Sequence, residues 1–300
     1  MKNKYKISFI IPVRDEEKTL LDLSNKIAAE CKKCAKISDF EIIFIDDGSQ
    51  DNSLKVLKKL KTQNNFIKVL SLRKNFGKSV ALQVGFNAAS GDLIFTIDAD
   101  LQDDPAEIPN FINKVDEGYD LVSGFKFNRL DSKEKCIASR IFNFITSRAS
   151  NIKIHDFNCG FKLYRKEVAK SFNMHSEMHR YTPVLAELNG FRCTEVKVHH
   201  QKRMHGVSKY GYSRYLNGLF DFIAVMYLMR YADRPMYFFG KIALVCGVLG
   251  IFCLFQNIVL AVLFALSAVL VLCFGILAHI VMLGIIKPER VENYVKERLL

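Results

Sequence analysis

The stretch LIFTIDADLQDDP, residues 93–105, joins an apolar run to a cluster of carboxylates. Its first five residues are apolar or β-branched and predict a buried strand over residues 93–97. Asp98 and Asp100 follow directly, and residues i and i+2 of an extended chain point to the same side. The two carboxylates are therefore suited to hold one metal ion together at the end of the strand.

Residues upstream of this stretch alternate between strand and helix patterns. Apolar, β-branched runs predict strands over residues 6–13, 40–45 and 67–72. Helical spacing predicts helices over residues 19–34, 54–60 and 79–89. Regular alternation of this kind is typical of an α/β domain with a parallel sheet and helices on both faces.

Polar clusters also follow the first two predicted strands, as RDEE at residues 14–17 and DDGS at residues 46–49. Ligands of open parallel sheets bind beyond the carboxyl ends of the strands. Carboxylates gathered there favour hydrogen bonds to a ribose or a base, and a divalent cation that bridges to phosphates. Ser49 and Asp51 are better explained as cap and turn residues. The chain has no GxxxxGKS/T motif and no GxGxxG motif after the first strand, which disfavours P-loop ATPases and dinucleotide-binding dehydrogenases.

The C-terminal part carries 45 consecutive positions, residues 242–286, without Lys, Arg, Asp or Glu. One membrane-spanning helix needs about 20 apolar residues, so this segment predicts two. Gln256 and Asn257 mark the turn, with spans over about residues 236–256 and 261–286. The expected domains are a globular domain over residues 1–211, an interfacial amphipathic region over 212–235, a two-helix transmembrane hairpin over 236–286 and a basic tail over 287–300.

The formal net charge is +12, from 43 Lys and Arg against 31 Asp and Glu. Many basic residues flank the uncharged segment: Lys202, Arg203, Lys209, Arg214, Arg230, Arg234 and Lys241 before it, and Lys287, Arg290, Lys296 and Arg298 after it. Basic flanks at both ends predict a multi-pass protein of the inner membrane, with the globular domain and both termini on the cytoplasmic side. The N-terminal MKNKYKISFIIPV has too short an apolar part for a secretory signal. A membrane-borne anion is the expected partner, and nucleic acid is not, because no nucleic-acid-binding motif occurs.

Six stretches of the chain resemble the family-two, GT-A-type glycosyltransferases, and among them the polyprenyl-phosphate glycosyltransferases. These are the dolichol-phosphate mannose synthases and their bacterial undecaprenyl-phosphate relatives. The matching stretches are IIPVRDEE (10–17), FIDDGSQDNS (44–53), NFGKSVALQVGFNAASGD (75–92), TIDADLQDDP (96–105), DFNCGFKLYRKE (156–167) and HHQKRMHGVSKYG (199–211). The resemblance implies a GT-A catalytic domain with a Rossmann-like, mostly parallel sheet, and the two apolar spans match the membrane-anchored members.

The resemblance also implies which residues bind the donor, a nucleoside-diphosphate sugar with UDP or GDP. Its nucleobase and ribose would lie against Pro12, Glu16 and Asp47. Asp98 and Ala99 would lie near the ribose and the reacting sugar. Asp100 and Gln102 would hold Mg²⁺ or Mn²⁺ on the diphosphate, where a hard cation stabilises the charge of the leaving group.

The acceptor implied by the resemblance is a polyprenyl phosphate, such as undecaprenyl phosphate. A phosphate monoester is largely dianionic at neutral pH and attacks without a strong general base, so it mainly needs cations that position it. The residues at the family's phosphate-contacting positions are Lys126, Arg129, Lys135, Ser139, Lys162, Arg203 and Lys209. Asp98 and Asp156 are the catalytic candidates, with Asp156 either orienting the acceptor or serving as a base.

The expected reaction is therefore an inverting, metal-dependent transfer of one sugar to a polyprenyl phosphate, for modification of cell-envelope glycans. Membrane-anchored relatives can assemble, so a homo-oligomer stays open. One alternative is a processive polysaccharide synthase, but such enzymes carry a QxxRW motif and this chain has no tryptophan. The other alternative is a non-enzymatic, membrane-tethered module that binds nucleotide sugars, which would leave the basic stretches unexplained.

Overall fold

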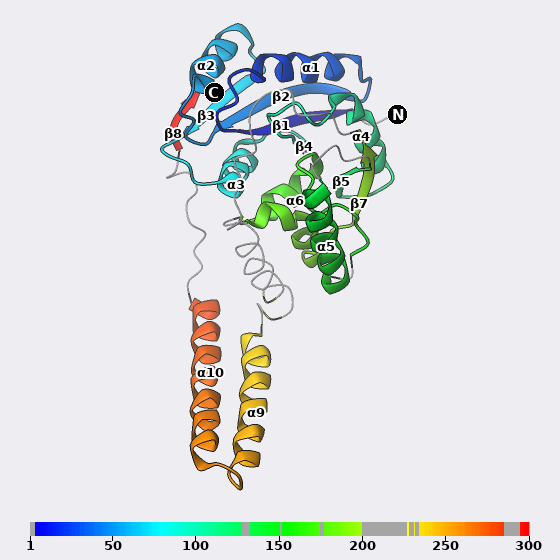
Figure 1. The fold of residues 1–300 in the computed structure, drawn as a ribbon. Helices are drawn as coiled ribbons and strands as arrows, with labels where there is room; N and C mark the ends of the chain where they lie inside the picture. Colours follow the sequence, from blue (N-terminus) through cyan, green and yellow to red (C-terminus); the bar gives the residue numbers. More distant parts are fainter. Residues whose placement is uncertain are drawn as a thin grey trace. The chain divides into compact units, whose positions relative to one another are not determined.

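The computed structural model describes residues 4–127, 133–150, 152–174, 177–199, 227, 231, 234–284 and 295–299. The chain divides into two compact units. The first comprises Met1–Asp221 together with Arg290–Leu300, and the second comprises Phe222–Glu289. Figure 1 shows the sheet of the first unit and the two long helices of the second.

The first unit is built on one sheet with the strand order β7-β5-β6-β4-β1-β2-β3-β8. Its strands are β1 (Tyr5–Val13), β2 (Ile37–Asp46), β3 (Ile67–Leu72), β4 (Leu93–Thr96), β5 (Leu121–Lys126), β6 (Lys162–Arg165), β7 (Cys193–Val198) and β8 (Val295–Leu299). β1 pairs in parallel with β2 and β4, β2 with β3, and β5 with β7. β6 and β8 run antiparallel to their neighbours. The predicted parallel α/β sheet and its first four strands are confirmed.

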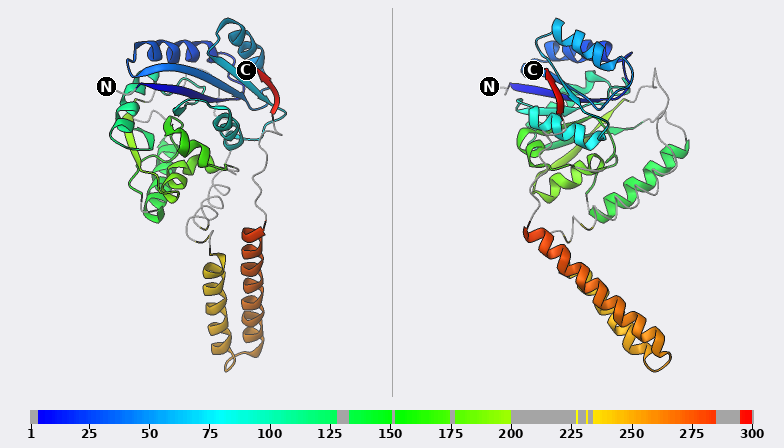
Figure 2. Two further views of the ribbon diagram at one scale, coloured as in Figure 1. Left: turned by 180° about the vertical axis from the view of Figure 1, so that it is seen from behind. Right: turned by 90° about the vertical axis from the view of Figure 1, so that its left-hand side faces the viewer.

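Helices cover both faces of this sheet. They are α1 (Leu20–Lys33), α2 (Ser53–Gln63), α3 (Lys78–Ala88), α4 (Ile108–Asp116), α5 (Lys133–Ser150), α6 (Lys166–Ser171) and α7 (Thr182–Leu188), with short 3-10 helices η1 (Pro105–Glu107) and η2 (Met178–Tyr181). α1, α2 and α4 contribute to the core on one face, and α3, α6 and α7 to the core on the other. Figure 2 shows the sheet from two further sides.

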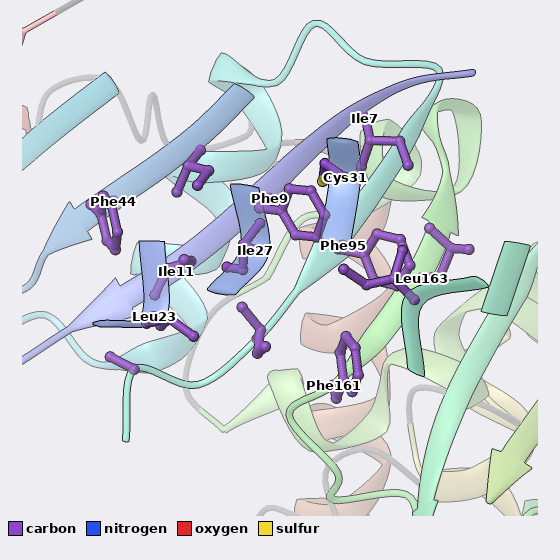
Figure 3. Close-up of a cluster of buried hydrophobic side chains, with 14 of the residues drawn as sticks. Ile7, Phe9, Ile11, Leu23, Ile27, Cys31, Phe44, Phe95, Phe161 and Leu163 are labelled. Carbon is purple, nitrogen blue, oxygen red and sulfur yellow. The ribbon is translucent and has the colours of Figure 1, made fainter. Parts of the chain in front are cut away.

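Side chains of successive strand residues alternate between the two cores. Phe9 lies in the first core and Ile10 in the second, and both are fully buried. Figure 3 shows the first core, where the ring of Phe9 stacks on that of Phe95 with centroids 5.2 Å apart. Burial on both faces explains why the central strands read as continuous apolar runs. It also fixes the register, because a slip of one residue would exchange the two faces.

The second unit contains two apolar helices, α9 (Pro235–Cys253) and α10 (Ile258–Gly284). Both are long and apolar enough to cross a membrane, as their sequence predicts, and Gln256 and Asn257 lie between them. Asn257 caps α10, since its Oδ1 accepts a hydrogen bond from the Leu260 N–H at 3.2 Å. Only 17% and 11% of the residues in their most apolar windows are buried. A core helix of a soluble protein would be mostly buried, so their apolar surface is suited to lipid.

The C-terminal segment adds a strand that the sequence analysis did not predict. Residues 295–299 form β8, which pairs with β3 at the edge of the sheet. The sequence of residues 287–300 predicts only a basic flank, because VKERL is short and rich in charge. The predicted interfacial amphipathic region over residues 212–235 lies outside the described residues, apart from Tyr227, Tyr231, Arg234 and Pro235.

Candidate active site

Three predicted acidic clusters and Lys162 lie at the carboxyl edge of the sheet, because neighbouring strands end at the same level. Val13 at the end of β1 pairs with Asp46 at the end of β2. Lys162 begins the antiparallel strand β6 and pairs with Thr96, the last residue of β4. The acidic clusters after β1, β2 and β4 therefore share one edge with Lys162.

Hydrogen bonds from backbone N–H groups to serine hydroxyls connect the loop after β1 to residues after β2. The N–H groups of Asp15 and Glu16 donate to the hydroxyls of Ser49 and Ser53 at 3.0 and 2.8 Å. Asp51 accepts from the Ser53 N–H at 2.9 Å, at the start of α2. Ser49 and Asp51 thus have structural roles in these loops, although the N-cap position of α2 is Asn52 and its side chain makes no capping hydrogen bond. Glu16 is thus held in place by its backbone, whereas Pro12 lies within β1 opposite Ile45.

Asp47 fastens the loop before α3. Its two carboxylate oxygens accept hydrogen bonds from the N–H groups of Phe76 and Gly77 at 2.7 and 3.0 Å. Burial raises the pKa of Asp47 against the opposing effect of these hydrogen bonds. Gly48 has a φ of +68°, and an added Cβ would lie 2.7 Å from the backbone of the same loop, so this close approach requires glycine. Asp47 therefore organises the loop before α3.

Asp98 lies near three lysines. Its Oδ1 accepts a hydrogen bond from Lys78 Nζ at 2.5 Å. Burial alone would raise the pKa of Asp98, but the charges of Lys78, Lys126 and Lys162 outweigh burial and lower it. Asp98 is therefore a carboxylate at neutral pH. Lys78, at the start of α3 and 20 residues upstream of Asp98, is not among the residues predicted from the sequence.

Gly160 provides the space for the Asp98 carboxylate. A Cβ added to Gly160 would lie 2.4 Å from Asp98 Oδ2, and real atoms do not approach so closely. The stretch DFNCGF therefore contributes a backbone position at which the carboxylate contacts the main chain. The sequence signal was the glycine itself, but glycine alone does not identify which side chain will need the space.

Asp100 and Gln102 lie in the turn that follows β4. Asp100 is buried, and its Oδ1 accepts from the Gln102 N–H at 3.3 Å. Leu101 between them has a φ of +60°, an uncommon conformation for a branched side chain and one found in tight functional turns. Among the residues that the structure describes, no three His, Cys, Asp or Glu side chains are grouped to hold a metal ion alone. Asp100 and Gln102 still fit Mg²⁺ or a similar ion, which usually takes one or two carboxylates and completes its shell with substrate phosphates.

Lys126 and Lys162, both predicted to contact the acceptor phosphate, lie near Asp98, where Lys162 is buried and Lys126 is partly buried. Lys126 Nζ lies 3.0 Å from Asp103 Oδ1. Burial alone would lower the pKa of Lys126, but the Asp103 charge outweighs burial and raises it. Lys162 Nζ donates to the carbonyls of Phe157 and Cys159 at 3.0 and 2.6 Å. Burial lowers the pKa of Lys162 to about 8. Asp103, the buried counter-ion of Lys126, is not among the site residues predicted from the sequence.

The remaining predicted residues are distributed as follows. Asp156 is buried, and its Oδ1 accepts from the Asn158 N–H at 3.2 Å. Ala99 is buried in the same turn as Asp98, and Ser139 lies half-buried on α5. Lys135 lies on α5, but its side chain is not described. Arg129, Arg203 and Lys209 lie outside the described residues.

The sequence profile of glycosyl transferase family 2 matches residues 8–172, which extend from within β1 through β6 and include the acidic clusters at the carboxyl edge. The chain belongs to glycosyl transferase family 2. This family-two glycosyltransferase is similar along almost its whole length to a curated relative, the dodecaprenyl-phosphate galacturonate synthase of Rhizobium johnstonii. The two are 32% identical over 317 residues, covering 98% of the chain and 92% of the relative.

Other relatives have related names and folds. The undecaprenyl-phosphate 4-deoxy-4-formamido-L-arabinose transferase of Yersinia pestis is 37% identical over 222 residues, covering 74% of the chain and 67% of that protein. Among solved structures, glucosyl-3-phosphoglycerate synthase from Mycobacterium tuberculosis superposes with a TM-score of 0.56 at 19% identity, over 75% of this chain and 79% of that one. The predicted GT-A-like fold of the glycosyltransferase is confirmed. Its two apolar helices and its relatives together indicate a membrane protein.

Proposed function

We propose that this glycosyltransferase transfers one sugar from a nucleoside-diphosphate sugar to a polyprenyl phosphate, with inversion at the anomeric carbon. The observation that carries the proposal is the end-to-end similarity to the dodecaprenyl-phosphate galacturonate synthase, which includes the two apolar helices. Two relatives that differ in sugar share a polyprenyl-phosphate name. The acceptor class is therefore common to them, whereas the sugar is not. A processive synthase is not favoured.

The donor half of the site is proposed to lie over the loops after β1, β2 and β4. Pro12, Glu16 and Asp47 would line the nucleobase and ribose, with UDP or GDP as the nucleotide. One solved neighbour, glucosyl-3-phosphoglycerate synthase, was crystallised with Mn²⁺ and UDP-glucose and has a TM-score of 0.54. Asp100 and Gln102 would hold Mg²⁺ or Mn²⁺, which would neutralise the charge that grows on the leaving diphosphate.

The chain's own residues would align the two substrates. An acceptor phosphate oxygen forms a bond to the anomeric carbon while the bond from that carbon to the nucleoside diphosphate breaks, and attack from the opposite face inverts the centre. Asp98, ionised and fixed by Lys78 and Gly160, would orient the sugar. Lys126 and Lys162 would supply positive charge behind the reacting groups, and Asp156 would orient the acceptor. Pre-positioning of this kind supplies much of the rate enhancement in group transfer.

Features outside the acidic edge support an acceptor that resides in the membrane. α5 carries Arg140, Phe144 and Arg148 at intervals of four residues, so they share one side of the helix, and all three are exposed. Phe144 is 72% exposed and its neighbour Ile145 is 44% exposed. Basic and apolar side chains on one helical face fit the headgroup region of a bilayer.

The strand pairing supports a hairpin topology. Residues 4–199 and β8 contribute to one sheet, so they lie on the same side of any membrane that α9 and α10 cross. The chain must then cross an even number of times between β7 and β8, and α9 and α10 provide two crossings. We propose that the shared side is cytoplasmic, because basic residues flank both ends of the hairpin.

A direct test uses membranes that contain the full chain. They are supplied with radiolabelled nucleotide sugars, undecaprenyl phosphate and Mn²⁺, and a lipid-extractable product is measured. Asp100→Asn should reduce the product by about 10²-fold or more, because the diphosphate loses a ligand of its counter-ion. Asp92→Asn is the matched control, because Asp92 accepts from the Lys6 N–H at the start of β1, at the opposite edge of the sheet. Full activity of Asp100→Asn would contradict the metal assignment, and no product from any donor would contradict the proposed reaction.

A further inference from the structure

The edge of β3 is occupied by the chain's own C-terminal segment. β8 pairs antiparallel with β3, with Leu299 opposite Val69, Arg298 opposite Leu70, and Val295 opposite Leu72. Without β8 this edge would expose a row of unpaired backbone N–H and C=O groups. In Figure 1 the red strand β8 lies beside β3, far in sequence from the rest of the sheet.

The direction of the two outermost strands places both chain connections at one edge of the sheet. β7 runs parallel to β5, and β5 and β4 both run antiparallel to β6, so β7 ends at the carboxyl edge, where the site residues gather. β8 runs antiparallel to β3, so it begins at the same edge. The connection to α9 therefore starts at the end of β7, and the connection from α10 ends at the start of β8. Both points lie at the carboxyl edge of the sheet, on its two border strands.

The two connections differ greatly in length. Between Val198 at the end of β7 and Pro235 at the start of α9 there are 36 residues, whereas only ten separate Gly284 from Val295. An extended chain spans at most about 3.6 Å per residue, so the shorter connection reaches no more than about 40 Å and the longer one about 130 Å. Pairing of β8 with β3 therefore adds a much tighter restraint than the longer connection provides.

We propose that residues 295–299 are a docking strand that ties the return end of the apolar hairpin to β3, beside the active-site edge. The proposal rests on the proposed function, because the benefit of a tether arises when the acceptor resides in the membrane. A short tether raises the effective concentration of the site at the bilayer without adding any contact to either substrate. Transfer to a bilayer acceptor then depends on β8, whereas donor binding and transfer to a soluble acceptor do not.

The first experiment tests the pairing itself and does not require activity. Val69→Cys with Leu299→Cys joins positions that face each other in the ladder, so mild oxidation of the full chain should form a disulfide within one chain. Leu70→Cys with Leu299→Cys is the matched control, because adjacent strand residues point to opposite faces of the sheet. The readout is the cross-linked peptide by mass spectrometry, with a non-reducing gel for dimers. Equal yield in both pairs, no disulfide, or a disulfide only between chains would overturn docking within one chain.

The second experiment tests the consequence. Glu297→Pro removes a backbone donor from the middle of β8, and Glu297→Ala keeps it. Each protein is assayed with undecaprenyl phosphate in vesicles and with a short, water-soluble prenyl phosphate. Glu297→Pro should lose about tenfold or more with vesicles and less than about twofold with the soluble acceptor, while Glu297→Ala keeps both activities. Equal losses with both acceptors, or no loss, would overturn the tether. An unmodified chain that is inactive with both acceptors would instead refute the proposed function, and the cross-link would still decide the pairing.

Discussion

Single residues at the carboxyl edge have little room to change, and Gly160 shows this most clearly. In Gly160→Ala the new methyl would lie 2.4 Å from Asp98 Oδ2, so the carboxylate must move and its hydrogen bond with Lys78 must change. We expect kcat to fall by about 10²-fold with a smaller change in KM for the donor, because misplacement of about 1 Å has effects of this size. The measurement is steady-state transfer by the two variants Gly160→Ala and Gly240→Ala. An added methyl at Gly240 would meet nothing within 4 Å, so equal activity of both variants would contradict the positioning role.

Glu41 is a buried carboxylate on β2 that stabilises the fold away from the site. It accepts from the Ser90 N–H at 2.8 Å and pairs with Lys68 at 2.7 Å, and the Ser8 hydroxyl also donates to it. Burial would raise the pKa of Glu41, but the hydrogen bonds from Lys68, Ser8 and Ser90 outweigh burial and lower it to about 2. A depressed pKa means that the ionised group stabilises the folded state above pH 4.5, and that this contribution is lost as the pH falls toward 2.

We therefore expect Glu41→Gln to lower the free energy of unfolding at pH 7 by about 3 kcal/mol, with the difference shrinking as the pH falls below about 4. Denaturant unfolding of the purified protein across this pH range measures the effect. Glu117→Gln is the control, since Glu117 forms an exposed ion pair with Lys114 on α4, and such pairs contribute about 0–1 kcal/mol. A pH-independent difference for Glu41→Gln would contradict the assigned ionisation.

At the scale of elements, the sequence predicted those whose periodicity is local. Residues 67–72 were expected as a strand and form β3, and the turn at Gln256 and Asn257 was located within a few residues. β8 could not be found this way, because five charged and apolar residues become a strand only when the edge of β3 is available. The membrane-flank pattern explains the charges of this segment, but it contains no information on strand pairing.

The candidate site, like the fold, could be predicted only in part from the sequence. The acidic residues after β1, β2 and β4 could be predicted because the carboxyl ends of neighbouring parallel strands meet at one edge of the sheet. Lys162 was predicted from the family resemblance. Lys78 and Asp103 were missed because their partners, Asp98 and Lys126, lie about 20 residues away along the chain. Only tertiary structure brings such pairs together, and a lone lysine or aspartate in a sequence is most often a solvated surface residue.

At the scale of the whole molecule, the proposed hairpin places the turn between α9 and α10 on the far side of the membrane from the sheet, because two crossings between β7 and β8 return the chain to its starting side. Phe255 in this turn is 92% exposed, and Leu21 on α1 is 53% exposed. In spheroplasts, Phe255→Cys should react with a membrane-impermeant maleimide, whereas Leu21→Cys should react only after the membrane is opened. The unmodified protein corrects for its own eight cysteines. Reaction of Leu21→Cys in intact spheroplasts would contradict the proposed orientation, in which the basic flanks and the sheet lie on the cytoplasmic side. Reaction of both variants in intact spheroplasts would rule out a hairpin that crosses the membrane. Strand pairing places β7 and β8 on one side of the membrane, but it does not determine the side of the turn.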